Sequence, residues 1–158
     1  MANQRQKQQY GDVQFRAATV EDVPWLWHLY RELLKPAIDA QWGWDETFQH
    51  RQFSNHLPAE LFTIAECERH AVATYALRNN ATHLYLHLLL ISADYQLQGL
   101  GTTLINRIKN QARQLNLPVE LSTFPANPVD AFYLKNGFAR FEATAEKKRF
   151  RWVAGKCS

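Results

Sequence analysis

A strand pattern, a turn with two glycines and a helix pattern follow one another in the middle of the chain, and this order limits the folds open to it. The segment LHLLLI at residues 86–91 is almost continuously apolar, as in a strand covered on both faces of a sheet. Residues 95–104, YQLQGLGTTL, then bring Gly99 and Gly101 directly before apolar residues at helical spacing. A further β-prone segment follows at residues 117–124. The three elements predict one βαβ unit, whose two strands run parallel.

The remaining elements have shorter signals. Strands are predicted at residues 13–19, 60–68, 69–78, 82–92, 117–124, 139–143 and 147–154, and helices at residues 19–36, from residue 45, at 101–116 and at 127–138. In the strand at 82–92 we expect Leu84, Leu86 and Leu88 to share one face. The hairpins on either side of the βαβ unit predict antiparallel pairs, so the sheet is mixed.

The first predicted helix has a signal at each end. Thr19 is its expected N-cap, and Asp22, three residues later, makes a weak capping box because Asp replaces the usual Glu. Pro36 is expected to end the helix.

Length and composition indicate a single globular domain. The chain has 158 residues, of which 46% are hydrophobic and 21% charged. We expect residues 1–12, which are polar and rich in Gln, to form a flexible tail, and residues 13–158 to form the domain. Cys67 and Cys157 make neither a disulfide framework nor a metal cluster, which fits a reducing compartment. With no apolar run of membrane-spanning length and no signal-peptide pattern, we expect a cytoplasmic protein without membrane contact.

The glycine turn has two explanations from the residues alone. The first N–H groups of a helix have no partners within it, and together with the helix dipole they form an anion site that glycines let a phosphate approach. The alternative is an ordinary tight turn that caps the helix. Two phosphate motifs are excluded, because the segment contains no G-x-x-x-x-G-K-[ST] and position 104 is Leu instead of the third Gly of G-x-G-x-x-G.

The segment LLLISADYQLQGLGTTLI resembles the acyl-CoA-binding motif of the GNAT superfamily of N-acetyltransferases, a strand followed by Q/R-x-x-G-x-G/A and a helix. Gln96, Gly99 and Gly101 match this motif. Downstream, LSTFPANPVDAFYLKNGFARF is similar to the superfamily's next motif, with matches at Asn127, Tyr133, Gly137 and Phe138. Upstream, FRAATVEDVPWLWHLY resembles its opening strand and helix. The resemblance covers about residues 13–153.

The resemblance implies the fold and the cofactor site. The fold it implies is mixed α/β (α+β): a central, mostly antiparallel sheet of about seven strands with a splayed parallel pair, and helices on both faces. The co-substrate is acetyl-CoA, and no metal is expected. The implied contacts are the strand residues Leu89, Leu90 and Ile91 on the pantetheine arm, the loop residues Gln96, Leu97, Gln98, Gly99, Leu100, Gly101 and Thr102 on the pyrophosphate, and Asn127 and Tyr133.

The same resemblance gives Tyr133 the role of the acid that protonates the leaving thiolate, although a tyrosine here also suits packing of its helix on the sheet. The general base is not determined by the sequence. His87 is the residue we select, because a histidine titrates in the required range and lies on the strand that leads to the site. His83, Glu66 and Glu120 are the alternatives, and each also suits an ordinary strand position.

The segment QWGWDE at residues 41–46 lies where the superfamily covers its acceptor site. Trp42 and Trp44 are expected to hold an amine by cation–π contact, and Asp45 and Glu46 to attract it. The equally weighted alternative is structural, with Asp45 capping the second helix, Glu46 favouring its N-terminus and both tryptophans packing in the core.

The function expected is transfer of an acetyl group from acetyl-CoA to a primary amine of a small molecule, peptide or protein, by direct attack through a tetrahedral intermediate. One alternative is a non-catalytic domain that binds acyl-CoA. Another is a basic nucleic-acid-binding module, which the net charge of +3 does not favour. The basic segment at residues 146–153 is instead expected to be an edge strand with outward charges. The identity of the acceptor is left open, and so is a homodimer.

Overall fold

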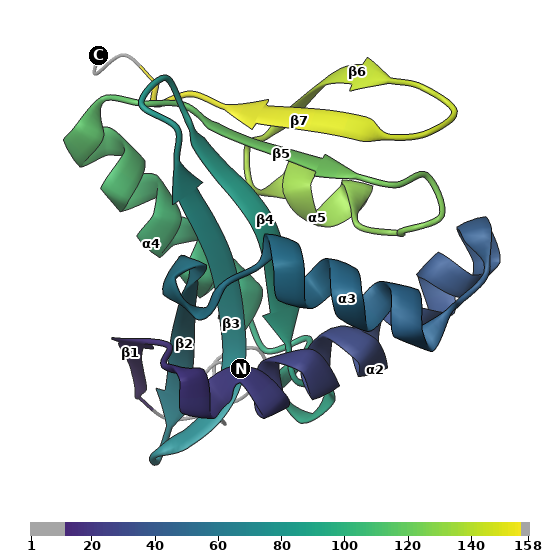
Figure 1. Cartoon of the computed structure of the whole chain (residues 1–158). Helices are drawn as coiled ribbons and strands as arrows, with labels where there is room; N and C mark the ends of the chain where they lie inside the picture. Colours follow the sequence, from purple (N-terminus) through teal and green to yellow (C-terminus); the bar gives the residue numbers. More distant parts are fainter. Residues whose placement is uncertain (1–11, 156–158) are drawn as a thin grey trace.

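A seven-stranded sheet organises residues 12–155, the part of the chain that the computed structural model describes (Figure 1). The strands are β1 (Val13–Ala17), β2 (Phe62–Cys67), β3 (His70–Asn79), β4 (Leu84–Ile91), β5 (Val119–Thr123), β6 (Ala139–Ala143) and β7 (Lys148–Trp152). Their order is β1-β2-β3-β4-β5-β7-β6, and only β4 and β5 are parallel. The predicted mixed, mostly antiparallel sheet is confirmed. The expected tail lies outside the described residues except for residue 12, and so does Cys157.

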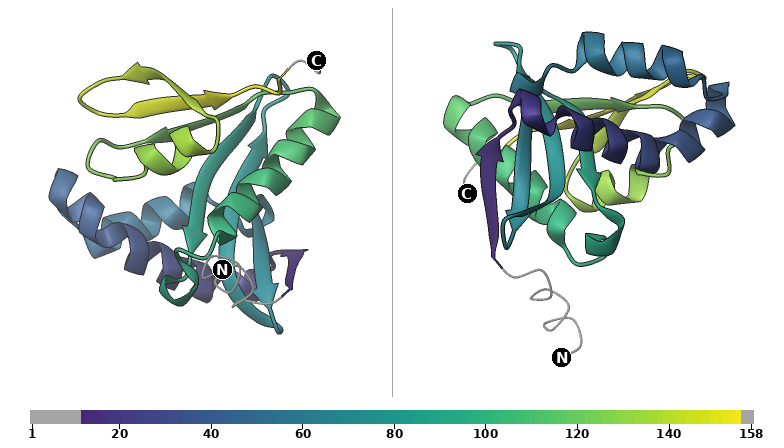
Figure 2. Two further views of the ribbon diagram at one scale, coloured as in Figure 1. Left: turned by 180° about the vertical axis from the view of Figure 1, so that it is seen from behind. Right: turned by 60° about the horizontal axis from the view of Figure 1, so that its bottom comes forward.

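Helices cover both faces of the sheet, as expected. They are α2 (Val23–Trp42), α3 (Glu46–His56), α4 (Leu100–Leu115) and α5 (Asp130–Lys135), with short 3₁₀ turns η1 (Val20–Asp22), η2 (Ala59–Leu61) and η3 (Ala93–Tyr95). Helices α2 and α3 lie in front of the sheet in Figure 1, and α4 and α5 lie on the opposite side, which the left view of Figure 2 brings forward. Among the described residues, none of the helices is both long and apolar enough to cross a bilayer.

Each face has its own apolar core. On the α4 side, Leu104, Ile105 and Ile108 of the helix pack in one cluster with Leu86 and Leu121 of the parallel strands. On the α2 side, a smaller cluster joins the helices to β2 and β3 through Leu26, Phe53, Phe62, Ile64 and Ala76. Burial of these residues fixes which face of each strand meets which helix.

Helix α2 does not end at Pro36, so that prediction was wrong. The helix continues for six residues beyond it, to Trp42. A proline inside a helix removes one backbone hydrogen bond, but the residues beyond it make tertiary contacts that offset this loss. Ile38 is buried, and the Gln41 side chain accepts a hydrogen bond of 2.9 Å from the backbone N–H of Ala126.

Strand β4 contains a β-bulge at His87. Leu86 pairs with Leu77 of β3, whereas Leu88 pairs with the adjacent Ala76, so that His87 is the extra residue. A bulge shifts the alternation of side chains along a strand. Leu86 therefore packs on the α4 side and Leu88 on the α2 side. The expectation that Leu88 shares a face with Leu84 and Leu86 was wrong for this reason.

The parallel pair β4–β5 separates at the same point. Its register comprises three residue pairs only, the last of which joins Leu86 to Leu121. Beyond it, β4 continues to Ile91 in contact with β3, while β5 ends at Thr123 (Figure 1). The splay implied by the family resemblance is thus present, and it begins at the bulge.

Strand β7 is not the edge strand expected of the basic segment, because it lies between β5 and β6. Its arginines bind an interior carboxylate: Arg149 and Arg151 contact Glu120 of β5 at 3.3 and 2.9 Å. A carboxylate that is only 7% exposed requires such partners, which explains the alternating basic residues of the segment.

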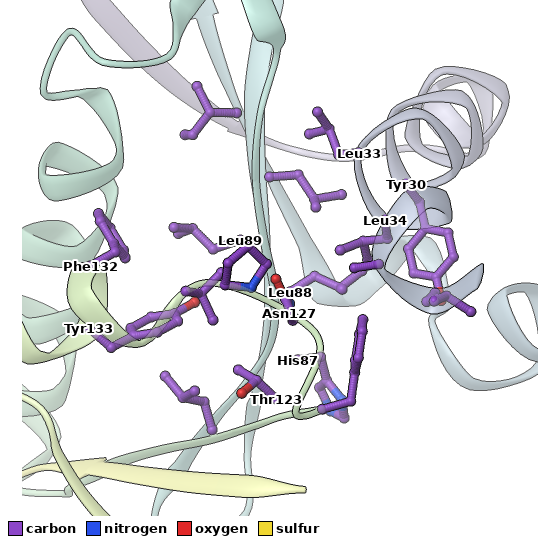
Figure 3. A pocket seen from close by; sticks show the side chains of 18 of the residues that line it. Tyr30, Leu33, Leu34, His87, Leu88, Leu89, Thr123, Asn127, Phe132 and Tyr133 are labelled. Carbon is purple, nitrogen blue, oxygen red and sulfur yellow. The ribbon is translucent and has the colours of Figure 1, made fainter. Parts of the chain in front are cut away.

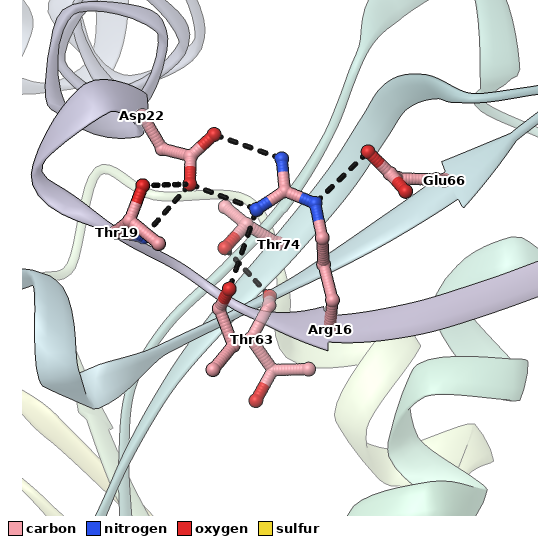
Figure 4. Close-up of polar contacts among 7 residues, drawn as sticks. Arg16, Thr19, Asp22, Thr63, Glu66 and Thr74 are labelled. Atoms are coloured by element: carbon pink, nitrogen blue, oxygen red, sulfur yellow. Dashed lines mark hydrogen bonds and ion pairs between the residues drawn. The ribbon is translucent and has the colours of Figure 1, made fainter.

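An ion-pair network fastens β1 to the start of α2 (Figure 4). The Arg16 guanidinium donates two hydrogen bonds of 2.9 Å to Asp22 and one of 3.0 Å to Glu66 on β2. The Asp22 carboxylate also accepts from the backbone N–H of Thr19 at 2.8 Å, which is the contact that the predicted capping box requires. These hydrogen bonds, those from Arg16 first, lower the pKa of Asp22 from 3.8 to about 2.

Replacing Asp22 with Asn is expected to lower the thermal midpoint at pH 7, with a difference that shrinks in acid. A carboxylate whose pKa is depressed on folding stabilises the protein above its unfolded pKa, and this stabilisation is lost as the pH falls through the folded value. The window is therefore from 3.8 down to about 2. Circular dichroism melts at several pH values measure the difference, with Glu21→Gln as the matched control. Equal midpoints at pH 7, or a difference independent of pH, would contradict the role of this carboxylate.

Candidate active site

A cavity of about 980 Å³ lies where β4 and β5 separate (Figure 3). Its walls come from both sides of the sheet. They are residues 86–91 of β4, residues 121–123 of β5 with Phe124 after them, one side of α2 from Tyr30 to Trp42, Gln49 of α3, residues 127–129, Phe132 and Tyr133 of α5, and Gln96, Leu97 and Gly101 around the glycine turn. A volume of this size suits a ligand of several hundred daltons.

The separated strands leave one edge of β4 open to the cavity. From Leu88 to Ile91, β4 is paired with β3 on one side, and within residues 12–155 it has no strand partner on the side of β5. Backbone N–H and C=O groups along such an edge need hydrogen-bond partners. The edge includes Leu89, Leu90 and Ile91, the residues expected to contact the pantetheine arm, and all three line the cavity.

The glycine turn places the N-terminus of α4 next to the cavity, which Gln96, Leu97 and Gly101 line. Gly99 is the N-cap and has φ +84°, in the left-handed region that glycine adopts readily. The backbone N–H of Thr103 donates to the Gly99 carbonyl at 3.1 Å, which is the first hydrogen bond of the helix. The N–H groups of Leu100, Gly101 and Thr102 come before it in the chain and have no partner within the helix. Such groups, with the helix dipole, favour an anion at this end of the helix.

Leu97 adopts an unusual backbone conformation in this turn. Its φ is +62°, and its side chain is 98% exposed. A leucine in the left-handed region costs of order 1 kcal/mol. The turn is therefore held in a shape that its own residue does not prefer, and neighbouring contacts must maintain it.

Two glutamine side chains supply those contacts. The Gln96 amide donates to the Ile91 carbonyl at 2.9 Å, and the Gln98 amide donates to the Asp94 carbonyl at 3.1 Å. Both were expected to contact the cofactor. In the structure the Gln96 amide nitrogen braces the turn against the end of β4, and the Gln98 amide nitrogen braces it against η3.

Gly101 packs closely against an aromatic ring. A Cβ atom at this position would lie 2.9 Å from the ring of Phe132 on α5, closer than such atoms approach in proteins. The absent side chain lets α5 pack against the first turn of α4. From the sequence, Gly101 was interpreted as a residue that lets a phosphate approach the backbone. The contact with Phe132 is a second feature that favours glycine at this position.

Tyr133 points its hydroxyl into the cavity from α5 (Figure 3). Its ring packs against Phe132, Phe138 and Phe150, with centroid distances between 5.1 and 5.8 Å. The residue is 7% exposed, and burial raises the pKa of its phenol, which is therefore protonated at neutral pH. Asn127 also lines the cavity, and its backbone carbonyl accepts from the Val129 N–H at 3.0 Å.

Two further polar atoms face this region. The Nε2 atom of His87 and the hydroxyl of Thr123 are buried, and neither has a hydrogen-bond partner among the residues that the structure describes. Burial lowers the pKa of His87 below 6.5, and the charge of Arg78 lowers it further, so the imidazole is neutral at pH 7. Thr123 was not singled out from the sequence, although it ends the strand predicted to run parallel to β4.

The other candidate bases lie away from the cavity. Glu66 binds Arg16, and Glu120 binds the two arginines of β7. His83 precedes β4, at the end far from the splay, and its ring nitrogens contact Asn80 and Thr82. His87 alone of the four lines the cavity.

Of the four expected acceptor residues, the cavity includes only Trp42. Trp44 packs on Trp27 at 6.2 Å between ring centroids and donates to Glu46 at 2.7 Å. Glu46 also binds Arg31 at 2.9 Å, and Asp45 caps α3 by accepting from the Phe48 N–H at 2.9 Å. The cap by Asp45 and the place of Glu46 in the first turn of α3 match the structural alternative, whereas Trp44 is half-buried and lies outside the two buried clusters.

Sequence reasoning missed the largest wall of the cavity. Helix α2 contributes Tyr30, Leu33, Leu34, Ala37, Ile38 and Trp42. The spacing of these residues continues one helical face through Pro36, and this continuity was the available signal. Within residues 12–155, no group of three or more His, Cys, Asp and Glu side chains is arranged to hold a metal ion.

Solved structures with this fold include several acetyltransferases. The PaiA N-acetyltransferase from Thermoplasma acidophilum, solved in complex with coenzyme A, has 18% identity and a TM-score of 0.75, over 90% of this chain and 99% of that chain. A GNAT-family acetyltransferase from Staphylococcus aureus Mu50 has 14% identity and a TM-score of 0.71, over 90% and 99%. The ribosomal-protein-S18-alanine N-acetyltransferase from Escherichia coli has 14% identity and a TM-score of 0.66, over 93% and 97%.

Comparison with curated protein sequences gives no match. The sequence model of the acetyltransferase (GNAT) family, in contrast, matches residues 24–138, well over half of the chain. This range contains α2, the splayed strands, the glycine turn and Tyr133, which together form the cavity. The chain therefore belongs to the acetyltransferase (GNAT) family.

Proposed function

We propose that this protein is an N-acetyltransferase that transfers an acetyl group from acetyl-CoA to a primary amine. The observation that carries the proposal is the splay of β4 and β5, which opens a cavity through the sheet with Tyr133 inside it. Acetyl-CoA fits this arrangement because a pantetheine arm carries amides that can pair with an unpaired strand edge, and a pyrophosphate suits a helix N-terminus.

In this proposal the turn and β4 hold the co-substrate. The backbone N–H groups of residues 97–102 bind the pyrophosphate, with Gln96 and Gln98 keeping the turn in shape. Leu89, Leu90 and Ile91 bind the arm through their backbone, and Asn127 contacts it from the opposite wall. A backbone N–H near Ile91 is the donor we assign to the carbonyl oxygen as negative charge develops on it.

The reaction then needs two proton transfers. The neutral amine attacks the thioester carbonyl, so that an N–C bond forms and the C–S bond breaks. His87 takes the proton that the amine loses, because its neutral imidazole has a free Nε2 atom at the cavity. Tyr133 gives its phenolic proton to the departing thiolate, since burial keeps the phenol protonated. The products are the acetylated amine and coenzyme A.

The second candidate is a domain that binds acyl-CoA without catalysis. It shares the strand edge and the turn, but it gives Tyr133 and His87 no chemical role. Binding of coenzyme A is common to both functions, whereas turnover separates them.

Coenzyme A and acetyl-CoA are both expected to raise the thermal midpoint by several degrees at concentrations about 100 times their dissociation constants. A ligand that binds only the folded state stabilises it by about 2.7 kcal/mol at that ratio, and for a chain of this length each kcal/mol is about 3 °C. ATP and NAD carry adenine and phosphates without a pantetheine arm and serve as controls. No response to either form of coenzyme A would overturn the proposed function.

Tyr133→Phe is expected to lower kcat about 100-fold while the affinity for acetyl-CoA stays unchanged. The substitution keeps the packed ring and removes only the proton donor, and a general acid contributes about 10²–10⁴ in rate. The matched control is Tyr75→Phe, which removes a buried hydroxyl that accepts from Arg107 at 3.1 Å on the core of the α4 side. Turnover within twofold of wild type would remove Tyr133 from the acid role.

The pH dependence of kcat is expected to report on His87. Because its pKa is below 6.5, the imidazole stays neutral from pH 8 down to 6.5 and becomes protonated, and so inactive as a base, at lower pH. kcat therefore falls on the acid side only. His87→Gln is expected to lower kcat at least tenfold and to abolish this acid limb, whereas His83→Gln keeps it. An unchanged acid limb in His87→Gln would assign the proton transfer to another group.

A further inference from the structure

The cavity is lined without a single charged side chain. Among the described residues, no Asp, Glu, Lys or Arg forms part of its wall. Its ionisable members are Tyr30, His87 and Tyr133, and each is neutral at pH 7, because burial raises the pKa of both phenols and lowers that of the imidazole. An acceptor that enters this space finds no counter-charge.

Helix α2 forms the wall of the cavity on the side where the acceptor is expected, called here the acceptor side, and this wall is apolar. Its cavity face consists of Tyr30, Leu33, Leu34, Pro36, Ala37, Ile38 and Trp42. The charged residues of the same helix lie outside the cavity wall: Arg31 binds Glu46 at 2.9 Å, the Lys35 ammonium lies 5.9 Å from the ring centroid of Trp44, and the Asp39 carboxylate accepts from the Trp44 backbone N–H at 3.0 Å. Glu32 pairs with His28 one turn earlier at 3.2 Å.

The far end of this wall is closed by contacts between α2 and the segment after β5. The ring of Trp42 packs on Phe124 at 5.0 Å between centroids, and Gln41 accepts from the Ala126 N–H at 2.9 Å. Both contacts span from α2 to the β5–α5 connection. The acceptor side is therefore bounded at this end, and because the cavity of about 980 Å³ must also hold the pantetheine arm, the space left suits a small molecule.

These features limit the chemistry of the acceptor. A charge moved from water into an uncharged wall loses its hydration without a compensating partner. An aromatic or branched aliphatic body, in contrast, gains by leaving water for contact with leucines and a tryptophan. A second ammonium or a carboxylate on the acceptor is thus selected against.

We propose that the acceptor is a small primary amine with a single nitrogen and an apolar, preferably aromatic, body that lies against the α2 face with its edge on Trp42. The inference deepens the proposed acetyltransferase function and rests on it. The amine reacts in its neutral form, which agrees with a wall that offers an ammonium no carboxylate.

The test compares three probe amines with the full-length protein at pH 8.5, with and without saturating coenzyme A. The probes are 2-phenylethylamine, L-phenylalanine, which adds a carboxylate to the same body, and 1,4-diaminobutane, which replaces the ring with a second amine. Calorimetry gives the dissociation constants, and acetyl-CoA turnover gives kcat/KM. We expect 2-phenylethylamine to bind at least tenfold more tightly than either charged probe and to have the highest kcat/KM.

Trp42→Ala tests the assigned wall. Trp42 is 59% exposed, so its truncation leaves the buried core intact. The expected result is about tenfold weaker binding of 2-phenylethylamine with unchanged affinity for coenzyme A. The matched control is Phe48→Ala on α3, which removes an aromatic ring that is 52% exposed and lies outside the cavity.

The outcomes separate the two proposals. If coenzyme A does not bind, the proposed function fails. If coenzyme A binds but a charged probe binds within twofold of 2-phenylethylamine, or none of the three binds, the inference about the acceptor is overturned and the acetyltransferase function stands. Equal effects of Trp42→Ala and Phe48→Ala would overturn the assignment of the α2 face.

Discussion

The short register between β4 and β5 is the constraint on which the site depends. Three residue pairs hold the two parallel strands together, and the last pair, Leu86 with Leu121, lies directly before the bulge at His87. The bulge turns β4 while it remains hydrogen-bonded to β3, so the sheet opens on one side without losing its continuity on the other. A cavity through the sheet, an open strand edge and a histidine at the opening all follow from one inserted residue.

The β4 side and the β5 side of this opening are joined by packing between α4 and α5. Phe132 of α5 fits against Gly101 at the start of α4, and the amide of Gln96 ties the glycine turn to the end of β4. The N-terminal end of α4, where we propose that the pyrophosphate binds, and the helix that carries Tyr133 therefore meet at the same contact. This arrangement couples the place where a phosphate group would bind to the place where a proton would be delivered.

The order of strands and helices could be predicted from the sequence, because periodicity and turn residues act locally. The features that failed depend on distant partners. The bulge at His87 is set by the register of β3, and continuation of α2 through Pro36 depends on contacts of Ile38 and Gln41. For Asp45 and Glu46 the sequence allowed both an acceptor role and a structural one, and their side chains contact Phe48, three residues after Asp45, and Arg31, fifteen residues before Glu46. Gly99 and Tyr133 could be singled out because short motifs carry them, whereas Thr123 belongs to no motif and the α2 wall is marked only by a helical spacing that Pro36 was expected to interrupt.

The contacts between α2 and the segment after β5 also bear on exchange with solvent. They are one hydrogen bond, from the Ala126 N–H to Gln41, and one aromatic contact, between Trp42 and Phe124. Neither belongs to the two buried clusters, and Trp42 is 59% exposed. Small molecules that pass the end of α2 therefore need only these two surface contacts to separate. The sheet and the core beneath it are not part of that path.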